Sequence, residues 1–213
     1  MNDRPYRVTG AFLDESAHEG ELLVDGARYR VTEADYRSLG FAEGDFLDES
    51  ALEAVCTAAE RLRCIRKAMD CLSYGDMSGK KLLGKLTGRF DRELASSVVE
   101  LLRARGYLDD AALSARLAES FYDNKLWGPL RIRSELSARG FSPEDVAAAL
   151  EPLEARDHTE NIRTLAERKF GRLSFDDYAQ KSKAFAYLYR SGYESADITD
   201  TISKMEQEER EWL

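Results

Sequence analysis

A unit made of a helix, a glycine turn, an aromatic residue and a second, capped helix recurs three times along the chain. The copies are Lys81–Leu102 (KLLGKLTGRFDRELASSVVELL), Leu130–Leu153 (LRIRSELSARGFSPEDVAAALEPL) and Ser182–Met205 (SKAFAYLYRSGYESADITDTISKM). Their aromatic residues are Phe90, Phe141 and Tyr193, which lie 51 residues (90 to 141) and 52 residues (141 to 193) apart. Because regular spacing of a whole helical unit is typical of repeat architectures, the sequence predicts tandem helical repeats.

The turn inside each copy predicts how its helix ends. A leucine precedes each turn, and a capping residue starts the next helix; the leucines are Leu86, Leu136 and Leu188, and the caps are Asp91, Ser142 and Ser195. Glycine readily adopts the left-handed conformation that ends a helix. The aromatic residue that follows is therefore expected to fold back onto the helix it has just left.

The first repeat also begins with a long helix. Its apolar residues recur at spacings of three and four, as on one face of a helix. The expected order is a helix capped by Asp48 or Ser50 and ended by Gly75, a short helix KKLLGKL from Ser78 to Gly88, and a helix capped by Asp91 and ended by Gly106.

The start of the chain has a different pattern. β-Branched and aromatic residues mark Tyr6–Leu13, Glu21–Val24 and Ala27–Val31, and Asp25-Gly26 suits a hairpin turn between the last two runs. A capping pattern at Thr32 to Asp35 then predicts a short helix that ends at Gly40.

We therefore predict a mainly α fold of three tandem three-helix repeats, preceded by a small β-hairpin-containing N-terminal segment. The expected boundaries are 1–48 for the β-containing segment, 49–108 for repeat 1, 109–155 for repeat 2 and 156–213 for repeat 3.

Charge is unevenly distributed along the sequence. The formal net charge is −9, but residues 1–60 hold 5 basic and 14 acidic residues, whereas residues 61–89 hold 8 basic and 2 acidic ones. The overall charge argues against strong independent binding to nucleic acid, although it hides a local cationic segment.

Cationic residues recur on the middle helix of each repeat. They are Lys80, Lys81, Lys85 and Arg89 in the first, Arg131, Arg133 and Arg139 in the second, and Lys181, Lys183 and Arg190 in the third. Stacked repeats present equivalent helices to the same side, so these residues could line one surface that meets phosphates or an acidic protein surface. The alternative is a solvated helix face without a partner.

The sequence offers no catalytic device, metal site or cofactor motif, so we expect a protein that is not an enzyme. Its two histidines, His18 and His158, fall in polar segments and are expected on the surface, and no metal-ligand spacing occurs. The stretch from Gly75 to Lys81 lacks the spacing and the hydroxyl residue of a phosphate-binding loop. Carboxylate pairs such as Asp109-Asp110 and Asp176-Asp177 suit turns and caps.

The cysteines and the hydropathy indicate a reduced, cytoplasmic compartment and no membrane contact. Cys56, Cys64 and Cys71 are odd in number and are expected as buried thiols in helices. No apolar run approaches the roughly 20 residues that span a bilayer.

Aromatic residues gather around the second and third repeats. They are Phe121, Tyr122 and Trp127 before the second, and Phe185, Tyr187 and Tyr189 within the third. At helical spacing most of them are expected in the core, with outward members such as Tyr187 able to anchor a protein interface.

The stretch Gly106–Phe141 closely resembles the RecX family of RecA regulators. A Gly-aromatic-aliphatic-acidic-Asp turn fits Gly106–Asp110, and the later motif fits Gly128, Arg131-Ile132, Glu135-Leu136 and Arg139-Gly140-Phe141. The closing segment AFAYLYRSGYESADITDTI is also similar, so that the resemblance covers roughly residues 60–205. Two positions depart from the family pattern: Gly88-Arg89 inverts the usual basic-Gly order, and Ser191 replaces a common basic residue.

The resemblance implies an elongated, curved array of three repeats, without cofactors, that acts in DNA recombination, DNA repair and the SOS response. Such a protein would bind the RecA–DNA filament and dampen ATP hydrolysis, strand exchange and coprotease activity, with weak direct contact to single- or double-stranded DNA. We expect a monomer. Two other hypotheses remain: a helix-turn-helix-like DNA-binding protein or transcription regulator, and a structural adaptor.

Overall fold

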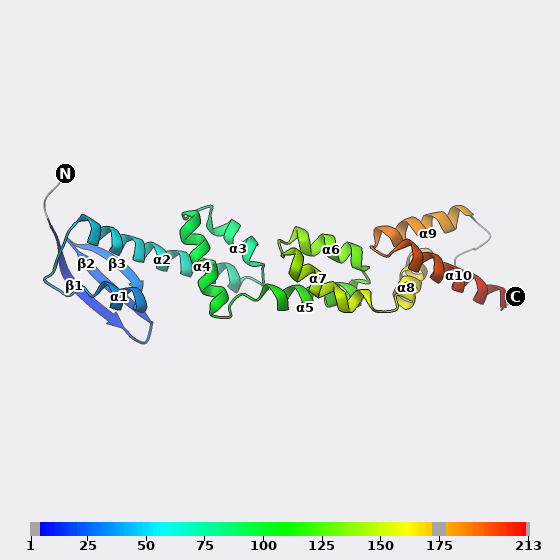
Figure 1. Cartoon of the computed structure of the whole chain (residues 1–213), viewed down its shortest axis with the longest axis horizontal. Coiled ribbons are helices and arrows are strands. Elements are labelled where there is room, and N and C mark those ends of the chain that lie inside the picture. Colours follow the sequence, from blue (N-terminus) through cyan, green and yellow to red (C-terminus); the bar gives the residue numbers. More distant parts are fainter. Residues whose placement is uncertain (1–4, 172–177, 212–213) are drawn as a thin grey trace. The chain divides into compact units, whose positions relative to one another are not determined.

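The computed structural model describes residues 5–171 and 178–211, and it is mainly helical with strands at its N-terminal end (Figure 1). The predicted fold class is thereby confirmed. The chain forms two compact units. The first unit comprises residues 1–76 and 82–105, and the second comprises residues 77–81 and 106–213.

The first unit opens with a four-stranded antiparallel sheet. Its strands are β1 (Tyr6–Asp14), β2 (Glu19–Val24), β3 (Ala27–Thr32) and β4 (Phe46–Leu47), in the order β3-β2-β1-β4. Asp25-Gly26 forms the predicted turn, with both residues at positive φ. Helix α1 (Glu33–Leu39) is capped by the Thr32 side chain, as expected, and ends at left-handed Gly40. Strand β4 was not predicted, because two residues carry no periodic signal.

Helices α1 and α2 (Glu49–Ser73) pack on one face of this sheet. The buried core there contains Val8, Leu22, Val24, Leu47 and Val55. The side chain of Asp48 accepts a hydrogen bond from the Ala51 N–H, so it is the cap of α2. Two of the α2 thiols, Cys64 and Cys71, are buried as expected, but Cys56 is exposed, and its predicted burial is wrong.

The first repeat continues with α3 (Gly79–Leu86) and α4 (Arg92–Ala104). Asp91 caps α4 by accepting hydrogen bonds from two backbone N–H groups. Residues 77–81 belong to the second unit, so the unit boundary falls inside α3.

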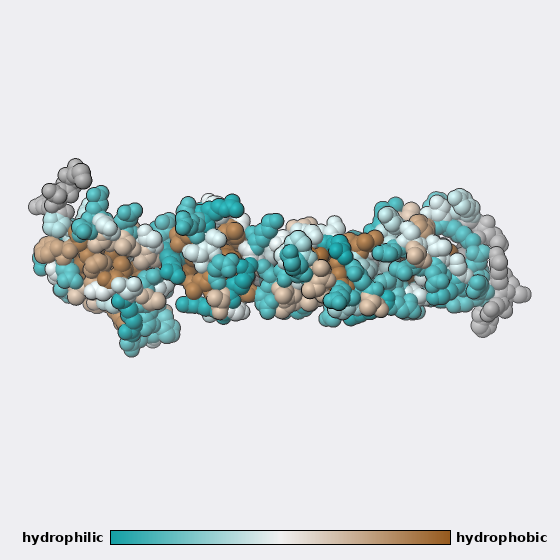
Figure 2. Space-filling model, in the orientation of Figure 1, coloured by the Kyte–Doolittle hydropathy of each residue, from teal (hydrophilic) through white to brown (hydrophobic). Residues whose placement is uncertain are grey.

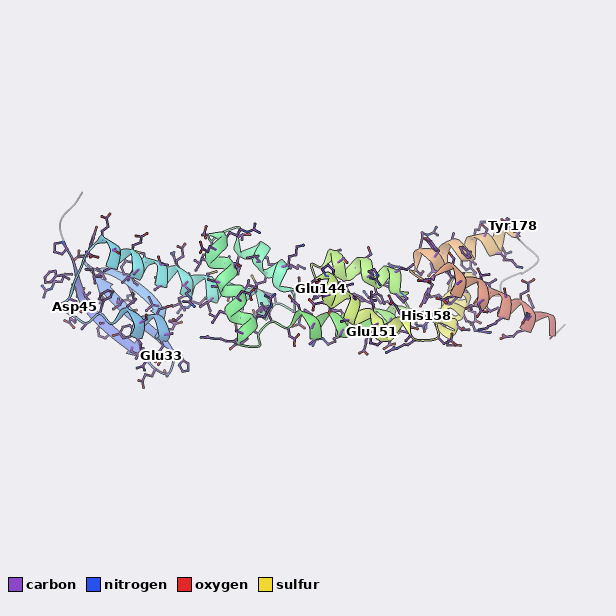
Figure 3. All side chains as sticks on the ribbon, viewed as in Figure 1. Glu33, Asp45, Glu144, Glu151, His158 and Tyr178 are labelled. Atoms are coloured by element: carbon purple, nitrogen blue, oxygen red, sulfur yellow. The ribbon has the colours of Figure 1, made fainter. Side chains whose placement is uncertain are left out.

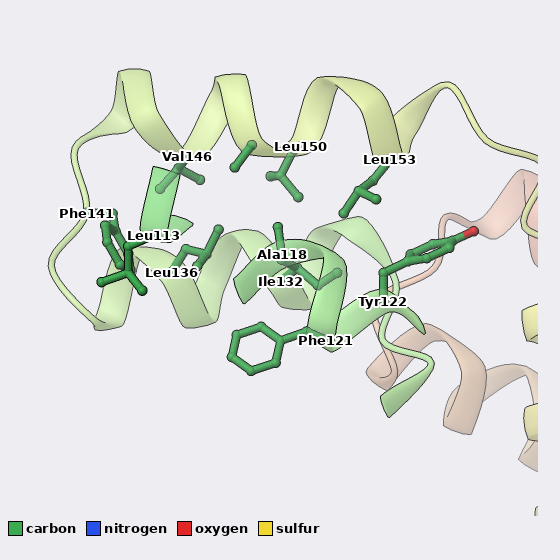
Figure 4. Close-up of a cluster of buried hydrophobic side chains, with 11 residues drawn as sticks. Leu113, Ala118, Phe121, Tyr122, Ile132, Leu136, Phe141, Val146, Leu150 and Leu153 are labelled. Carbon is green, nitrogen blue, oxygen red and sulfur yellow. The ribbon is translucent and has the colours of Figure 1, made fainter. Parts of the chain in front are cut away.

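The second unit contains α5 (Asp110–Lys125), α6 (Pro129–Ala138), α7 (Pro143–Glu154), α8 (Thr159–Phe170), α9 (Tyr178–Arg190) and α10 (Ser195–Glu211). Helices α5, α6 and α7 enclose one apolar core, in which Val146, Leu150 and Leu153 face Ile132 and Leu136 (Figure 4). A second core joins α8, α9 and α10, and Leu188 and Tyr193 are fully buried in it.

Two of the three predicted glycine turns have the expected conformation. Gly140 and Gly192 have φ of 89° and 97°, and the aromatic residue after each is buried. Gly88 is not left-handed, which corrects the prediction for the first repeat. There the N–H of Phe90 still bonds to the Leu86 carbonyl oxygen at 3.0 Å, so the chain leaves α3 without a reversal of φ.

Candidate partner-binding surface

The start of α3 lies against the glycine turn at the end of α6. Ser78 donates a hydrogen bond from its hydroxyl to the carbonyl oxygen of Arg139 at 2.6 Å, and the Asp110 carboxylate accepts from the Gly79 N–H at 2.9 Å. A Cβ at Gly140 would lie 3.3 Å from the Cβ of Lys80. Lys80 and Arg139, predicted from different repeats, are thus neighbours.

The start of α6 lies against the next glycine turn in the same way. The N–H groups of Gly128 and Leu130 donate to the carbonyl oxygens of Ser191 and Gly192 at 2.8 and 3.0 Å. A Cβ at Gly192 would lie 2.4 Å from the Cβ of Arg131, so a side chain there would clash. In both junctions, therefore, a left-handed glycine without a side chain lets the start of the preceding repeat's middle helix pack closely on the turn.

The cations of the first repeat are solvent-exposed. On α3, Leu82 and Leu86 are fully buried, whereas Lys81 and Lys85 are one turn apart on the exposed side. Within the residues that the structure describes, no carboxylate pairs with Lys80, Lys81, Lys85 or Arg89. Lys80 and Lys81 belong to the second unit, and Lys85 and Arg89 belong to the first.

The second repeat places its cations over aromatic rings. The Arg131 guanidinium carbon lies 3.9 Å from the centre of the Trp127 ring, and Lys125 Nζ lies 4.5 Å from the same ring. Lys125 Nζ is also 4.7 Å from the Phe121 ring, and the Arg139 guanidinium carbon is 5.1 Å from it. The two rings are 4.9 Å apart. We call Phe121, Lys125, Trp127, Arg131 and Arg139 the cation–aromatic cluster.

The chain reversal after α5 builds this cluster, and the sequence reasoning missed it. Leu126 has φ of 54°, which is unusual for leucine, and the Trp127 N–H bonds to the Phe121 carbonyl oxygen at 3.1 Å. The indole is thereby brought back over the Phe121 ring. Lys125 was not among the predicted site residues, although its spacing of four from Phe121 was a usable signal.

Some predicted cations are already paired within the protein. Arg133 donates to the Glu154 carboxylate at 2.7 Å, and Arg139 donates to Glu135 at 2.8 Å. In the third repeat, Lys181 binds Glu206 at 2.7 Å, whereas Lys183 and Arg190 are exposed. These ion pairs lower the positive charge that the second and third repeats present, so the first repeat carries the more available cations.

A buried polar cluster around His158, which is labelled in Figure 3, joins the second repeat to the third. The hydroxyl of Tyr122 lies 2.9 Å from Nδ1 of His158, and the Tyr193 hydroxyl donates to the Leu126 carbonyl oxygen at 3.1 Å. His158 is 7% exposed, so its expected surface position is wrong. Burial raises the pKa of both Tyr122 and Tyr193, which keeps both hydroxyls protonated.

Other aromatic residues differ in part from expectation. Tyr187 packs in the third-repeat core, edge-on to Phe170, and the outward aromatic residues of α9 are Tyr178 and Tyr189, which are 84% and 53% exposed. Because α9 is helical, neighbours two positions apart point in different directions.

The acidic residues considered in the sequence serve structural roles where the structure describes them. Asp109 caps α5, and Glu33 lies 2.9 Å from the exposed His18 (Figure 3). Asp176-Asp177 lies outside the described residues. In the described part of the chain, no cluster of His, Cys, Asp and Glu could hold a metal ion. The same part has no helix with the length and apolarity needed to cross a membrane.

Known proteins match this chain in sequence. The family model for the second three-helix domain of RecX matches residues 109–150, and the model for its third three-helix domain matches residues 156–202. A Regulatory protein RecX from Stenotrophomonas maltophilia is 35% identical over 135 residues, which cover 63% of this chain and 82% of that protein. One from Xanthomonas axonopodis pv. citri is 34% identical over the same shares of the two chains.

Solved structures share the fold. The crystal structure of a regulatory protein RecX matches with a TM-score of 0.77 at 22% identity, over 92% of this chain and 99% of that one. RecX from Lactobacillus salivarius matches with a TM-score of 0.62 at 19% identity, over 70% and 99% of the two chains. With the glycine turns, the docked middle helices and the sequence identity to curated relatives, the resemblance is confirmed: the chain belongs to the RecX family of regulatory proteins.

Proposed function

We propose that this protein modulates the RecA recombinase by binding the RecA–DNA filament and dampening ATP hydrolysis, strand exchange and coprotease activity. It acts by binding, without chemistry of its own. Its cationic residues contact acidic recombinase surface or exposed DNA phosphate, and the protein acts as a monomer.

One observation carries this proposal: the segment Ser78–Lys80 of the first repeat packs on the Arg139–Gly140 turn of the second, which brings cations of successive repeats to one backbone junction. Arg139 belongs in turn to the cation–aromatic cluster, which adds Lys125 and Arg131. Arg139 donates its Nε–H to Glu135 but, like Lys125 and Arg131, retains other guanidinium or ammonium hydrogens for a partner. Cations of two repeats that meet at one hydrogen-bonded junction suit an acidic partner whose own geometry is regular.

The mechanism follows from the docked repeats. Backbone hydrogen bonds at the Gly128–Ser191 junction tie the second and third repeats together. If two repeats joined in this way contact neighbouring RecA protomers, this protein resists changes in the spacing of those protomers. We propose that it thereby hinders the motions that accompany ATP turnover in the filament.

The decisive experiment measures RecA ATP hydrolysis on single-stranded DNA while this protein is titrated in. The triple variant Lys81→Glu, Lys85→Glu, Arg89→Glu should lose inhibition while its thermal unfolding stays that of the parent protein. The variant Arg63→Glu, Arg168→Glu, Lys169→Glu carries the same charge change at exposed positions of α2 and α8, and it should inhibit normally. Unchanged inhibition by the folded first variant would refute the assignment.

A second variant tests the cation–aromatic cluster separately. Trp127→Ala removes the ring beneath Arg131, so the inhibition constant should rise by about five- to ten-fold. Tyr189→Ala removes an exposed aromatic residue of α9 and serves as the matched control. Equal inhibition by the Trp127→Ala and Tyr189→Ala variants would show that the cation–aromatic cluster does not contribute to binding.

The affinity for DNA alone distinguishes the proposed RecA modulator from a helix-turn-helix-like DNA-binding regulator. Affinity for single- and double-stranded DNA is measured without RecA over a range of salt concentrations. Weak binding is expected, because the chain carries a net charge of −9. Tight binding at physiological salt with a steep salt dependence would favour a DNA-binding regulator instead.

A further inference from the structure

The outer face of the N-terminal sheet has a composition unlike the rest of the first unit. The opposite face is covered by α1 and α2 and contains Leu22 and Val24. Side chains alternate across a strand, so Glu21 and Leu23 point the other way. The strand register places Phe12 opposite Glu21 and Glu21 opposite Arg30. These pairs form one row across the outer face.

A second row runs beside it. Gly10 is opposite Leu23, and Leu23 is opposite Arg28. Because Gly10 has no side chain, the Phe12 ring leans over it; a Cβ there would lie 2.8 Å from the ring and 3.0 Å from the Leu23 side chain. At the β4 side, Arg7 is opposite Phe46.

Within the first unit, as far as the structure describes it, this face exposes two aromatic rings, whereas α1 and α2 cover the opposite face. Phe12 is 57% exposed and Phe46 is 65% exposed, and Leu23 is half-buried between strands. Figure 2 shows hydrophobic side chains gathered at the end of the first unit that carries the sheet. Phe12 forms an apolar group with Gly10 and Leu23, and Phe46 lies opposite Arg7, five residues from Phe12 along β1, so the face offers two separate apolar contacts to a partner.

Arginines are concentrated on this same face. Residues 1–60 contain five basic residues, and Arg7, Arg28 and Arg30 all lie on the outer face; the other two are Arg4 and Arg37. Three acidic residues, Asp14, Glu19 and Glu21, share the outer face with these three arginines. Three of the five basic residues of this segment therefore lie on the face that carries the exposed rings.

Local carboxylates leave much of this positive charge available. The Glu21 carboxylate is shared, with its two oxygens 3.4 Å from Arg28 Nε and 3.3 Å from Arg30 Nε. Asp14 accepts hydrogen bonds from Ser16 and the Ala17 N–H, and Asp25 accepts from the Arg7 backbone N–H. Glu19, at the end of the face, binds Arg66 of α2. The terminal nitrogens of the Arg28 and Arg30 forks can therefore take a further anion.

We propose that this face binds an acidic segment of a partner protein, one that carries apolar side chains among its carboxylates. The carboxylates meet Arg7, Arg28 and Arg30, and the apolar side chains cover Phe12 and Phe46. This site is separate from the cationic–aromatic surface of the repeats, and it does not depend on the function proposed above.

Charge complementarity favours this occupant over two others. A second copy of the chain, packed face to face, would bring like-charged arginine rows together. A long nucleic acid would run an unbroken row of phosphates past Glu21, in the middle of the face, and it carries no aliphatic side chains to cover Phe12 and Phe46. A short acidic and apolar segment meets the local cations and covers the rings.

The test uses the full chain and short fluorescein-labelled peptides, followed by fluorescence anisotropy. One peptide alternates pairs of glutamates with single leucines, and an uncharged control peptide has glutamine in place of every glutamate. The glutamate peptide should bind, and Arg28→Glu with Arg30→Glu should weaken it by about ten-fold or more. Phe12→Ser and Phe46→Ser, each made alone, should weaken it about five-fold.

The matched control is Arg37→Glu with Arg92→Glu, two exposed arginines of the first unit that lie off the face. It should bind the glutamate peptide like the parent protein. Thermal unfolding checks that each variant is folded.

Four results would overturn the proposal. They are failure of the glutamate peptide to bind, equal binding of the glutamine peptide, binding unaffected by the arginine and phenylalanine variants, and preferential binding of oligothymidine through those same residues. Concentration-dependent self-association that Phe12→Ser abolishes would instead identify a second copy as the occupant.

Discussion

Gly128 and Gly192 meet backbone to backbone: a Cβ at Gly128 would lie 2.2 Å from the carbonyl oxygen of Gly192. Neither the α6 start nor the glycine turn can move away without losing the hydrogen bonds that join them. Gly128→Ala should therefore destabilise the second unit by about 1–3 kcal/mol, as overpacked sites do. Urea unfolding measures the loss, and hydrogen exchange should show it first in α9.

Gly84→Ala is the matched control for this change. Gly84 is helical and exposed on α3, with no atom within 4 Å of a Cβ placed there. Alanine has the higher helix propensity, so this variant should be unchanged or up to about 1 kcal/mol more stable. A Gly128→Ala protein as stable as Gly84→Ala would show that the junction can relax.

The Tyr193 hydroxyl holds the turn after α5. It donates to the Leu126 carbonyl oxygen at 3.1 Å, and the Tyr193 side chain is fully buried. Tyr193→Phe leaves that acceptor without its donor and should cost about 1–3 kcal/mol of unfolding free energy. Tyr189→Phe, at an exposed tyrosine on the same repeat, should cost nothing measurable. Equal denaturation midpoints for the two variants would contradict this role.

The three thiols should differ sharply in reactivity. Cys56 is exposed, whereas Cys64 and Cys71 are buried, and burial raises the pKa of Cys64 to about 11. Since the thiolate is the reactive form, a thiol reagent at mildly alkaline pH should label native Cys56 rapidly and the other two only on unfolding. Mass spectrometry counts the labels. Cys56→Ser should abolish native labelling, and rapid labelling of that variant would contradict the burial.

The Asp91 cap of α4 should make the free energy of unfolding depend on pH in the acidic range. Hydrogen bonds from the N–H groups of Glu93 and Leu94 hold the pKa of Asp91 below its ordinary value of 3.8. Because the folded pKa is the lower one, this stabilisation is present above about pH 4 and is lost as pH falls through the folded value.

Asp91→Asn keeps an oxygen acceptor but removes the titration. The difference between its unfolding free energies at neutral and acidic pH should therefore be smaller than that of the parent protein. Glu53→Gln, at an exposed carboxylate of α2, is the control. Denaturant titrations across this pH range give both values, and identical pH profiles for Asp91→Asn and the parent would exclude the cap as a contributor.

Much of the fold could be predicted because its signals are local. The Asp25-Gly26 hairpin, the Thr32, Asp48, Asp91 and Ser142 caps, and the left-handed Gly140 and Gly192 each depend on a few adjacent residues. Apolar periodicity likewise predicted the buried leucines of α3, α6 and α9.

The candidate site was less predictable, because spacing identifies cations but does not show what they contact. Sequence spacing singled out Arg131, Arg133 and Arg139, yet the structure places Arg131 on Trp127 and pairs Arg133 with Glu154. The sequence predicts His158 on the surface because its neighbours in the sequence are charged. It is buried because Tyr122, 36 residues away, supplies a hydrogen-bond partner.

The sequence by itself determined the repeat, its caps and its glycine turns, because helix periodicity and backbone conformation are properties of short stretches. Only the tertiary structure decided which segments pack against these turns. Gly140 and Gly192 each receive the middle helix of the preceding repeat, through contacts that join residues about 60 positions apart, as Ser78 joins Arg139. Gly88 has no preceding repeat to receive and keeps an ordinary conformation. Such contacts depend on where whole helices pack, so the same motif has different geometry in different repeats.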